Sequence, residues 1–153
     1  MIPKEFFVTS GEAVSQISQL NAFDRALKNA GIEQCNLVPV SSILPPTCKE
    51  SEWKKIPAGS ITHTVIARMD GEGETTIAAG IAWAWEKNMK YGLVAEANGR
   101  MGKEALRETL EWKIKEMAKA REIEINKIGY RTDVLSVPTG NYGCAIAALV
   151  FIP

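Results

Sequence analysis

Apolar and polar positions alternate along much of the chain, and this pattern predicts strands with one helix near the start. Residues 5 to 9 (Glu-Phe-Phe-Val-Thr) suit a first strand, and the polar stretch from Ser10 to Gln19 suits a loop. A helix follows, because apolar side chains recur at helical spacing on one face: Leu20, Phe23, Leu27 and Ala30. We expect Gly31 to end it. Residues 35 to 40 then suit a short strand, and residues 46 to 60 a loop.

The middle of the chain reads as two strands joined by a turn. Residues 61 to 69 alternate and lead into Asp70-Gly71-Glu72-Gly73, so we predict a β-hairpin with a strand at residues 75 to 86. In that second strand, large residues lie on one face and small ones on the other, which predicts burial on both faces. The large residues are Ile77, Ile81, Trp83 and Trp85, and the small ones are Ala78, Gly80, Ala82 and Ala84.

The last third of the chain predicts a long helix among strands. Residues 91 to 97, 123 to 136 and 142 to 152 suit strands, and residues 102 to 121 suit an amphipathic helix. Its apolar stripe is Leu106, Leu110, Ile114 and Met117, and its expected surface pairs are Arg107 with Glu111 and Glu111 with Lys115. The order of elements predicts an α+β fold of helices packed on mostly antiparallel sheets, and the pattern is compatible with one sheet or two.

Composition supports a single compact domain over residues 1 to 153, because 46% of the residues are hydrophobic and 24% are charged. Eighteen Lys and Arg balance eighteen Asp and Glu, so no overall field favours nucleic acid or an anionic membrane. The longest apolar runs, at 77 to 85 and 144 to 152, are shorter than a membrane span, and the first residues lack a signal-peptide pattern. We therefore expect a cytoplasmic protein.

The usual signatures of metal and nucleotide sites are missing. Cys35, Cys48 and Cys144 form no CxxC pair, and His63 is the only histidine, so a zinc site has too few ligands and the thiols are expected to be reduced. The pair Gly71-x-Gly73 has no third glycine, and no phosphate-binding loop motif occurs. His63 lies on an apolar strand face, where a packed core histidine is favoured over a catalytic base.

One segment stands out, because Ser41 and Ser42 meet at a strand end with prolines on both sides. Alone, such a pair reads as a polar turn. Its surroundings, however, resemble the pyruvoyl-dependent arginine decarboxylase family in a specific block that runs Leu20-Asn21-Ala22-Phe23-Asp24, Asn29-Ala30-Gly31-Ile32, Asn36-Leu37, Ser41-Ser42-Ile43 and Pro45-Pro46. Weaker resemblance continues through Gly92-Leu93-Val94-Ala95-Glu96, Gly102-Lys103-Glu104-Ala105 and Gly143-Cys144-Ala145, while residues 10 to 19 and 47 to 60 diverge.

The resemblance implies that the chain cuts itself between Ser41 and Ser42. The Ser42 hydroxyl would attack the Ser41 carbonyl and convert the amide to an ester, and elimination with loss of ammonia would leave a pyruvoyl group at position 42. Residues 1 to 41 would become the β chain and residues 42 to 153 the α chain. Asn36 matches a family asparagine near the cut and is the candidate oxyanion donor, with a turn-capping amide as the alternative.

The resemblance also implies roles for three further residues. Glu96 matches the catalytic proton donor, and burial on its apolar strand is expected to raise its pKa; a surface carboxylate is the alternative. Asp24 matches an acidic family residue whose carboxylate can bind the guanidinium of a substrate, and a surface aspartate without such a role is the alternative. Leu20 would line the aliphatic stem of the substrate. The pyruvoyl group would replace pyridoxal phosphate, and no metal is expected.

By resemblance we expect an αββα sandwich that forms a homotrimer of cleaved protomers, with sites between neighbours. The reaction would turn L-arginine into agmatine and CO2, in polyamine biosynthesis or acid resistance. Two alternatives stay open. The first is the same chemistry on another cationic amino acid, such as lysine or ornithine. The second is an uncleaved, non-catalytic trimeric binding or regulatory protein of the same fold.

Overall fold

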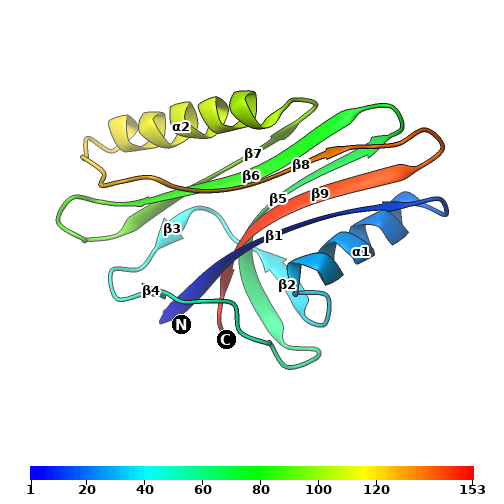
Figure 1. Ribbon diagram of the computed structural model, residues 1–153. Helices are drawn as coiled ribbons and strands as arrows, with labels where there is room; N and C mark the ends of the chain where they lie inside the picture. Colours follow the sequence, from blue (N-terminus) through cyan, green and yellow to red (C-terminus); the bar gives the residue numbers. More distant parts are fainter.

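The computed structural model describes residues 1–153 and consists of two sheets with one helix on the outer side of each (Figure 1). The elements in chain order are β1 (Glu5–Ser15), α1 (Gln19–Ala30), β2 (Asn36–Pro39), β3 (Ile43–Leu44), β4 (Lys49–Glu50), β5 (Ile61–Glu72), β6 (Thr76–Trp85), β7 (Gly92–Gly99), α2 (Lys103–Ala120), β8 (Gly129–Ser136) and β9 (Tyr142–Phe151). The predicted α+β class is confirmed.

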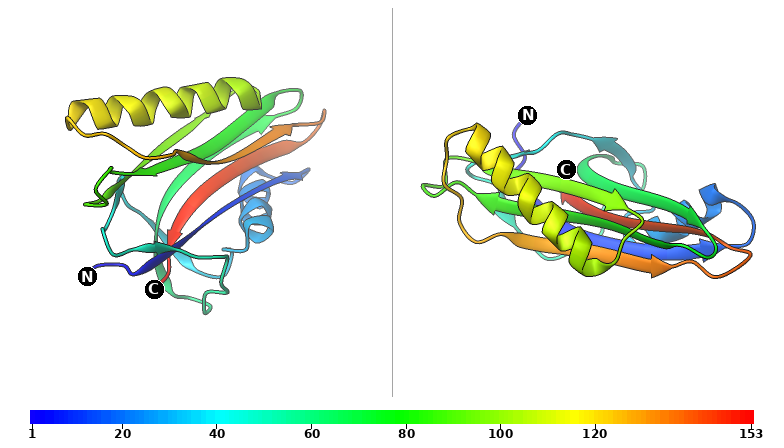
Figure 2. Two further views of the ribbon diagram at one scale, coloured as in Figure 1. Left: turned by 60° about the vertical axis from the view of Figure 1, so that its left-hand side comes forward. Right: turned by 90° about the horizontal axis from the view of Figure 1, so that it is seen from above.

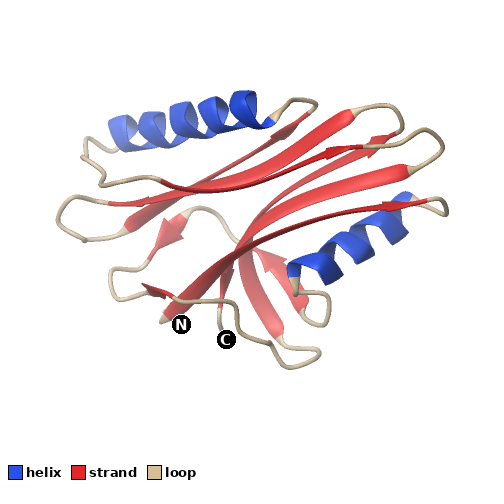
Figure 3. Cartoon of the chain, in the orientation of Figure 1, coloured by secondary structure: helices blue, strands red, loops and turns tan.

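The first sheet has the strand order β2-β5-β9-β1-β4, and the second has the order β3-β7-β6-β8. The long strands pair antiparallel throughout, whereas the short strands β2 and β4 pair parallel with β5 and β1. Figure 3 shows the two sheets stacked, with helix α1 against the first and helix α2 against the second. The question of one sheet or two is therefore answered in favour of two.

Three apolar clusters follow these layers. The cluster between the sheets includes Phe6, Val65 and Ile81. A second cluster lies under α1, and a third lies under α2, where Leu106, Leu110 and Ile114 are fully buried. The strand at β6 is buried on both faces as predicted, because Ile77 and Ile81 face the first sheet while Ala78 and Ala82 face α2.

The predicted hairpin of residues 61 to 86 is wrong. Strand β5 pairs with β2 and β9 in the first sheet, whereas β6 pairs with β7 and β8 in the second. The turn between them carries the chain from one sheet to the other. Both strands contribute large apolar residues to the cluster between the sheets, so they stack face to face. Alternation of apolar residues looks the same for stacked strands as for paired ones.

The predicted loop from Ser10 to Gln19 is also wrong over its first part, because β1 continues to Ser15 in register with β9. Helix α1 crosses β1 so closely at Gly11 that any side chain there would collide with the Ala26 carbonyl oxygen. A glycine is therefore required where the helix packs on the strand.

Helix α1 begins after Ser18, whose Oγ accepts a hydrogen bond from the Asn21 N–H at 3.1 Å, and it ends at Gly31 in the left-handed conformation (φ 77°). The predicted stop is confirmed, and so is most of the predicted apolar face, because Ala30 is buried and Phe23 and Leu27 pack against the same cluster. The buried residues are Ala22, Ala26 and Ala30, because small side chains allow the helix to approach the sheet closely. Leu20 is 71% exposed.

Helix α2 keeps most of its predicted features. Its buried stripe is completed by Ala118, with Met117 half-buried beside it. The predicted pair of Lys115 and Glu111 is present at 2.6 Å, but the Arg107 guanidinium lies 4.3 Å from the centre of the Tyr130 ring instead of pairing with Glu111. Seen from above, α2 runs obliquely across its sheet (Figure 2).

Smaller differences concern loops. Within the expected loop of residues 46 to 60, Lys49 and Glu50 pair with the start of β1, and the strand expected from residue 123 begins only at Gly129. No helix in the structure has both the length and the apolar character needed to cross a membrane.

Candidate active site

The Ser41-Ser42 peptide lies where the chain passes from the first sheet to the second. Strand β2 ends at Pro39 and β3 begins at Ile43, so the two serines bridge the gap between the sheets. Both sides of the bridge are held by backbone hydrogen bonds. The Val40 N–H donates to the Thr64 carbonyl at 2.8 Å, and the Ser42 carbonyl accepts from the Val94 N–H at 2.8 Å. Ser41 is exposed and Ser42 is half-buried.

A cavity of about 790 Å³ opens beside this peptide. Strand β7 supplies one wall and the second half of α2 supplies the other. The structure thus brings together three of the predicted residues, Ser41, Ser42 and Glu96. The remaining lining residues are Val94, Ala95, Trp112, Lys113, Glu116, Met117, Ala120 and Arg121.

Glu96 lies on β7, two residues after the strand residue that binds Ser42. Glu96 is exposed and is one of the residues that line the cavity, while Ala95 and Ala97 on the opposite face of the strand are buried under α2. Partial burial of the Glu96 carboxyl raises its pKa, and the nearby Lys113 ammonium acts in the opposite direction. The net direction is upward, as expected from the sequence. Glu96 therefore keeps its proton to a higher pH than an ordinary glutamate.

Helix α2 contributes charged and apolar groups that the sequence interpretation missed. The Lys113 Nζ donates to the Glu96 carbonyl oxygen at 3.0 Å, so this cation is fixed beside the strand. Trp112 is 66% exposed, although it is the largest apolar side chain of the helix surface. In the sequence, only the position of Trp112 outside the apolar stripe of the helix indicated that this surface has a function. Together with Glu116 and Arg121, these residues make a cavity that can hold an amino acid by charge and by apolar contact.

Asn36 lies outside this cavity, at the exposed start of β2. Its Nδ2 donates to the Gly59 carbonyl at 3.1 Å, and its backbone N–H donates to the Ser60 carbonyl at 2.9 Å. In the intact chain the side chain therefore caps the turn before β5, which is the alternative that the sequence left open.

Asp24 and Leu20 also lie away from the serine pair. Both are exposed residues of α1, on the outer side of the first sheet, whereas the cavity belongs to the second sheet and α2. One chain thus does not bring these two residues to Ser42.

His63 is half-buried and lines a second cavity of about 860 Å³ on the other side of the serine loop, so the packed core position expected for it is wrong.

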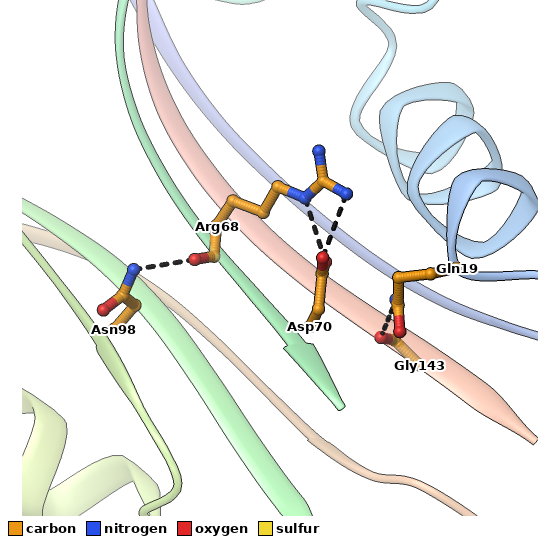
Figure 4. Close-up of polar contacts among 5 residues, drawn as sticks. All are labelled: Gln19, Arg68, Asp70, Asn98 and Gly143. Atoms are coloured by element: carbon orange, nitrogen blue, oxygen red, sulfur yellow. Dashed lines mark hydrogen bonds and ion pairs between the residues drawn. The ribbon is translucent and has the colours of Figure 1, made fainter. Parts of the chain in front are cut away.

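A polar cluster of Arg68, Asp70 and Asn98 joins the two sheets (Figure 4). The Arg68 guanidinium donates to both carboxylate oxygens of Asp70, at 2.9 and 3.0 Å, and lies 3.7 Å from the centre of the Phe23 ring. On the other side, the Asn98 Nδ2 donates to the Arg68 carbonyl at 2.7 Å. Since Asn98 follows Glu96 on β7, this bond fixes the end of the strand that carries the candidate acid.

The same cluster contains a buried thiol and a helix-to-strand bond. The Gln19 Nε2 donates to the Gly143 carbonyl at 2.6 Å, which ties the start of α1 to β9 (Figure 4). Burial, together with the Asp70 carboxylate, raises the pKa of Cys144 to about 12, so this thiol stays protonated and unreactive. The spacing of Arg68 and Asp70, two residues apart on one strand face, was the sequence signal for the cluster.

Comparisons with known proteins show which family the sequence resembles. Residues 5–153 match the family described as pyruvoyl-dependent arginine decarboxylase (PvlArgDC). A protein of Methanopyrus kandleri named pyruvoyl-dependent arginine decarboxylase is 32% identical over 150 residues, which cover 98% of this chain and 97% of the relative.

Two further relatives carry the same name. The protein of Methanocaldococcus jannaschii is 33% identical over 96% of this chain and 88% of its own length. The protein of Methanococcus vannielii is 37% identical over 84% of this chain and 79% of its own length. The matched region contains the serine pair, Glu96 and the helix that faces them. On these grounds, the chain belongs to the pyruvoyl-dependent arginine decarboxylase family.

Proposed function

We propose that this protein cleaves itself between Ser41 and Ser42 and, as the chains 1 to 41 and 42 to 153, converts L-arginine to agmatine and CO2. The observation that carries the proposal is the shared cavity of the serine pair and Glu96 in a member of this family. The two stacked sheets between two helices support the finer description of the fold as an αββα sandwich of the pyruvoyl-dependent decarboxylase type.

The residues around position 42 fit a pyruvoyl group made from Ser42. The serine lines a cavity with room for an amino acid, and its carbonyl is anchored to β7, so a new chain end at residue 42 would stay beside Glu96. When present, the group supplies a ketone that condenses with the substrate amine and withdraws electrons as CO2 leaves, which makes pyridoxal phosphate unnecessary.

The chain's own side chains would perform the remaining steps. The Ser42 hydroxyl attacks the Ser41 carbonyl to start cleavage. The Glu96 carboxyl, with its raised pKa, holds the proton that the substrate Cα receives after CO2 has left. Asn36 lies at the far end of the extended strand β2 from Ser41 of its own chain, so it would serve the oxyanion at Ser41 of a neighbouring chain in the homotrimer.

Substrate recognition would come from a second copy of the chain. Asp24 and Leu20 are exposed on α1 and are remote from the cavity of their own chain, so they would complete the site of a neighbour in a homotrimer. A carboxylate such as Asp24 binds a guanidinium through two parallel hydrogen bonds, while Leu20 offers apolar contact to the stem.

An exposed apolar strip supports such an assembly. We call it the edge patch, and it consists of Val38, Val40, Ile43 and Ile61, which are 37%, 38%, 44% and 58% exposed. It runs along the sheet edges on either side of the serine pair, so a neighbouring chain that covers it would also close the active site. The three unpaired cysteines suit a reducing compartment, which supports a cytoplasmic location.

The activity is tested by release of CO2 and formation of the amine product from L-arginine, L-lysine and L-ornithine. We expect arginine to be preferred, and we expect Asp24→Asn to raise KM for arginine more than it lowers kcat. Arg25→Gln, one residue further on the same exposed helix, is the control. Equal rates with all three substrates would contradict the assignment of arginine. No CO2 from any of them would favour the non-catalytic alternative.

A further inference from the structure

The backbone N–H of Val94 is aimed at the Ser42 carbonyl oxygen, with an N to O distance of 2.8 Å. We propose that this N–H is the donor that stabilises negative charge on the Ser42 oxygen during the elimination step of self-cleavage. The inference rests on the proposed function, because it presupposes cleavage between Ser41 and Ser42. It adds a catalytic group that is a main-chain atom.

The chemistry places negative charge on this oxygen in the second step and not in the first. In the first step the Ser42 Oγ bonds to the Ser41 carbonyl carbon, the peptide C–N bond breaks, and the freed amine takes the proton. In the second step a water molecule removes the Ser42 Cα proton, and the electron pair moves onto the Ser42 carbonyl as an enolate. The bond between Cβ and the ester oxygen then breaks, and the Ser41 carboxylate departs.

The remaining balance involves water and ammonia only. Loss of the carboxylate leaves a carbon-carbon double bond at residue 42, beside its amine. A proton shift and the addition of one water release ammonia and leave the ketone. No oxidant or reductant is needed. The enolate is thus the only species in which the Ser42 carbonyl oxygen carries a full negative charge.

The Val94 donor is held rigidly for this purpose. Val94 is 1% exposed and lies in β7, which runs between β3 and β6 in the second sheet. Strand β3 is only two residues long and pairs Ile43 with Leu93 and Leu44 with Gly92, so the bond to Ser42 extends this ladder into the loop. A preorganised donor in such surroundings acts strongly, and removal of one typically slows a reaction by about 10²–10³-fold.

The carbonyl that is attacked in the first step lacks such a partner. The Ser41 oxygen accepts no hydrogen bond within the chain, whereas the Ser42 oxygen accepts the one from Val94. The two steps should therefore respond differently to loss of the Val94 N–H. Ester formation should proceed, and the ester should then persist.

The test replaces Val94 with its α-hydroxy acid, which puts an oxygen where the N–H was and leaves the side chain unchanged. The same replacement at Val137 is the matched control, because the Val137 N–H donates to the Thr75 carbonyl at the same distance of 2.8 Å. Val137 follows β8, at the edge of the sheet opposite β3.

Hydroxylamine and intact mass measurement report the step that fails. Hydroxylamine cuts an ester between residues 41 and 42 and leaves serine at the start of the second fragment, whereas completed processing leaves a fragment one ammonia lighter. We expect the Val94 replacement to accumulate the ester and to form the lighter fragment about 10²-fold more slowly. The Val137 replacement should process at nearly the normal rate.

Equal processing rates for the two replacements would overturn the role of Val94, while an unmodified protein that never cleaves would instead overturn the proposed function. A second measurement does not depend on the ester proteins folding. In a Ser42→Ala chain, which cannot form the ester, amide hydrogen exchange should show the Val94 N–H to be protected. Rapid exchange at Val94 would contradict the proposal.

Discussion

The role proposed for Glu96 requires a protonated carboxyl, and the surroundings of this residue favour that state. Partial burial raises its pKa, although Lys113 limits the effect. The other charged groups that line the cavity are Glu116 and Arg121 on α2. The charge state of Glu96 is therefore set by the balance between partial burial and a single nearby lysine.

Replacement of Glu96 with Gln should separate cleavage from catalysis. The amide cannot donate a proton as an acid does, so we expect kcat to fall by about 10²–10⁴-fold while the chain still cleaves. Glu108→Gln, on the exposed side of α2, is the control and should keep full activity. Decarboxylation is followed by CO2 release and cleavage by a denaturing gel. A Glu96→Gln protein with normal kcat would remove Glu96 from the mechanism.

The pH dependence should depend on Lys113. In the proposed mechanism Glu96 acts in its protonated form, so we expect activity below the pKa of Glu96 and its loss as the pH rises through that pKa. Lys113 lowers that pKa, and Lys113→Met should therefore move the alkaline limb of kcat/KM to higher pH. Lys113→Arg should keep the normal profile, as should Lys115→Met outside the cavity. A Lys113→Met profile with an unchanged limb would show that the lysine has only a structural role.

At the scale of the elements, close packing of small residues decides how α1 sits on the first sheet. The helix buries its alanines and crosses β1 at Gly11. We expect Gly11→Val to destabilise the protein by about 1–3 kcal/mol, because the new side chain meets the helix backbone. Gly102→Ala, where nothing lies within 4 Å of the added carbon, is the control. Thermal unfolding measures both, and equal melting temperatures would contradict the close contact.

The same packing explains which elements could be predicted from sequence. Helix α2 and the doubly buried β6 were predictable, because their patterns follow directly from burial on one stripe or on two faces. The face of α1 was predictable only in part, since the buried Ala22 and Ala26 carry a weaker signal than the exposed Leu20. The pairing of β5 was not, since Asp70, Gly71 and Glu72 suggested a turn but continue the strand opposite β9, and the crossing to the second sheet follows them.

The candidate site also contains residues that could be predicted from sequence and residues that could not. The serine pair and Glu96 were identified from local sequence resemblance, and the structure brings them into one cavity. Lys113 and Trp112 could not be assigned from sequence, because their contact with β7 depends on how α2 crosses the sheet. The Val94 donor could not be predicted from sequence either, since almost every residue type has the same backbone N–H.

At the scale of the whole molecule, a cut after Ser41 would leave the two fragments interleaved. Strand β1 pairs along its length with β9, and β2 pairs with β5, so residues 1 to 41 lie within the first sheet. Both termini of the chain lie at one end, where the Ile152 N–H donates to the Glu5 carbonyl at 3.0 Å (Figure 1). The fragments should therefore stay together without a covalent link.

We expect the native protein to sediment as a trimer that contains both fragments. Ile61→Asp places a charge in the edge patch and should weaken the trimer. Ala105→Asp is the control, because Ala105 is exposed in the first turn of α2, outside both the patch and the cavity. Analytical ultracentrifugation measures the assembly of both variants. A trimer that tolerates Ile61→Asp as well as Ala105→Asp would place the interface elsewhere, and a monomeric parent protein would contradict the shared site.

The central claim is that Ser42 becomes a pyruvoyl group, and intact mass spectrometry with and without a carbonyl-reactive reagent tests it most directly. The proposed function predicts two fragments that meet at Ser41, the second lacking one ammonia and forming an adduct with the reagent. A single intact chain that persists after long incubation and forms no adduct would contradict it.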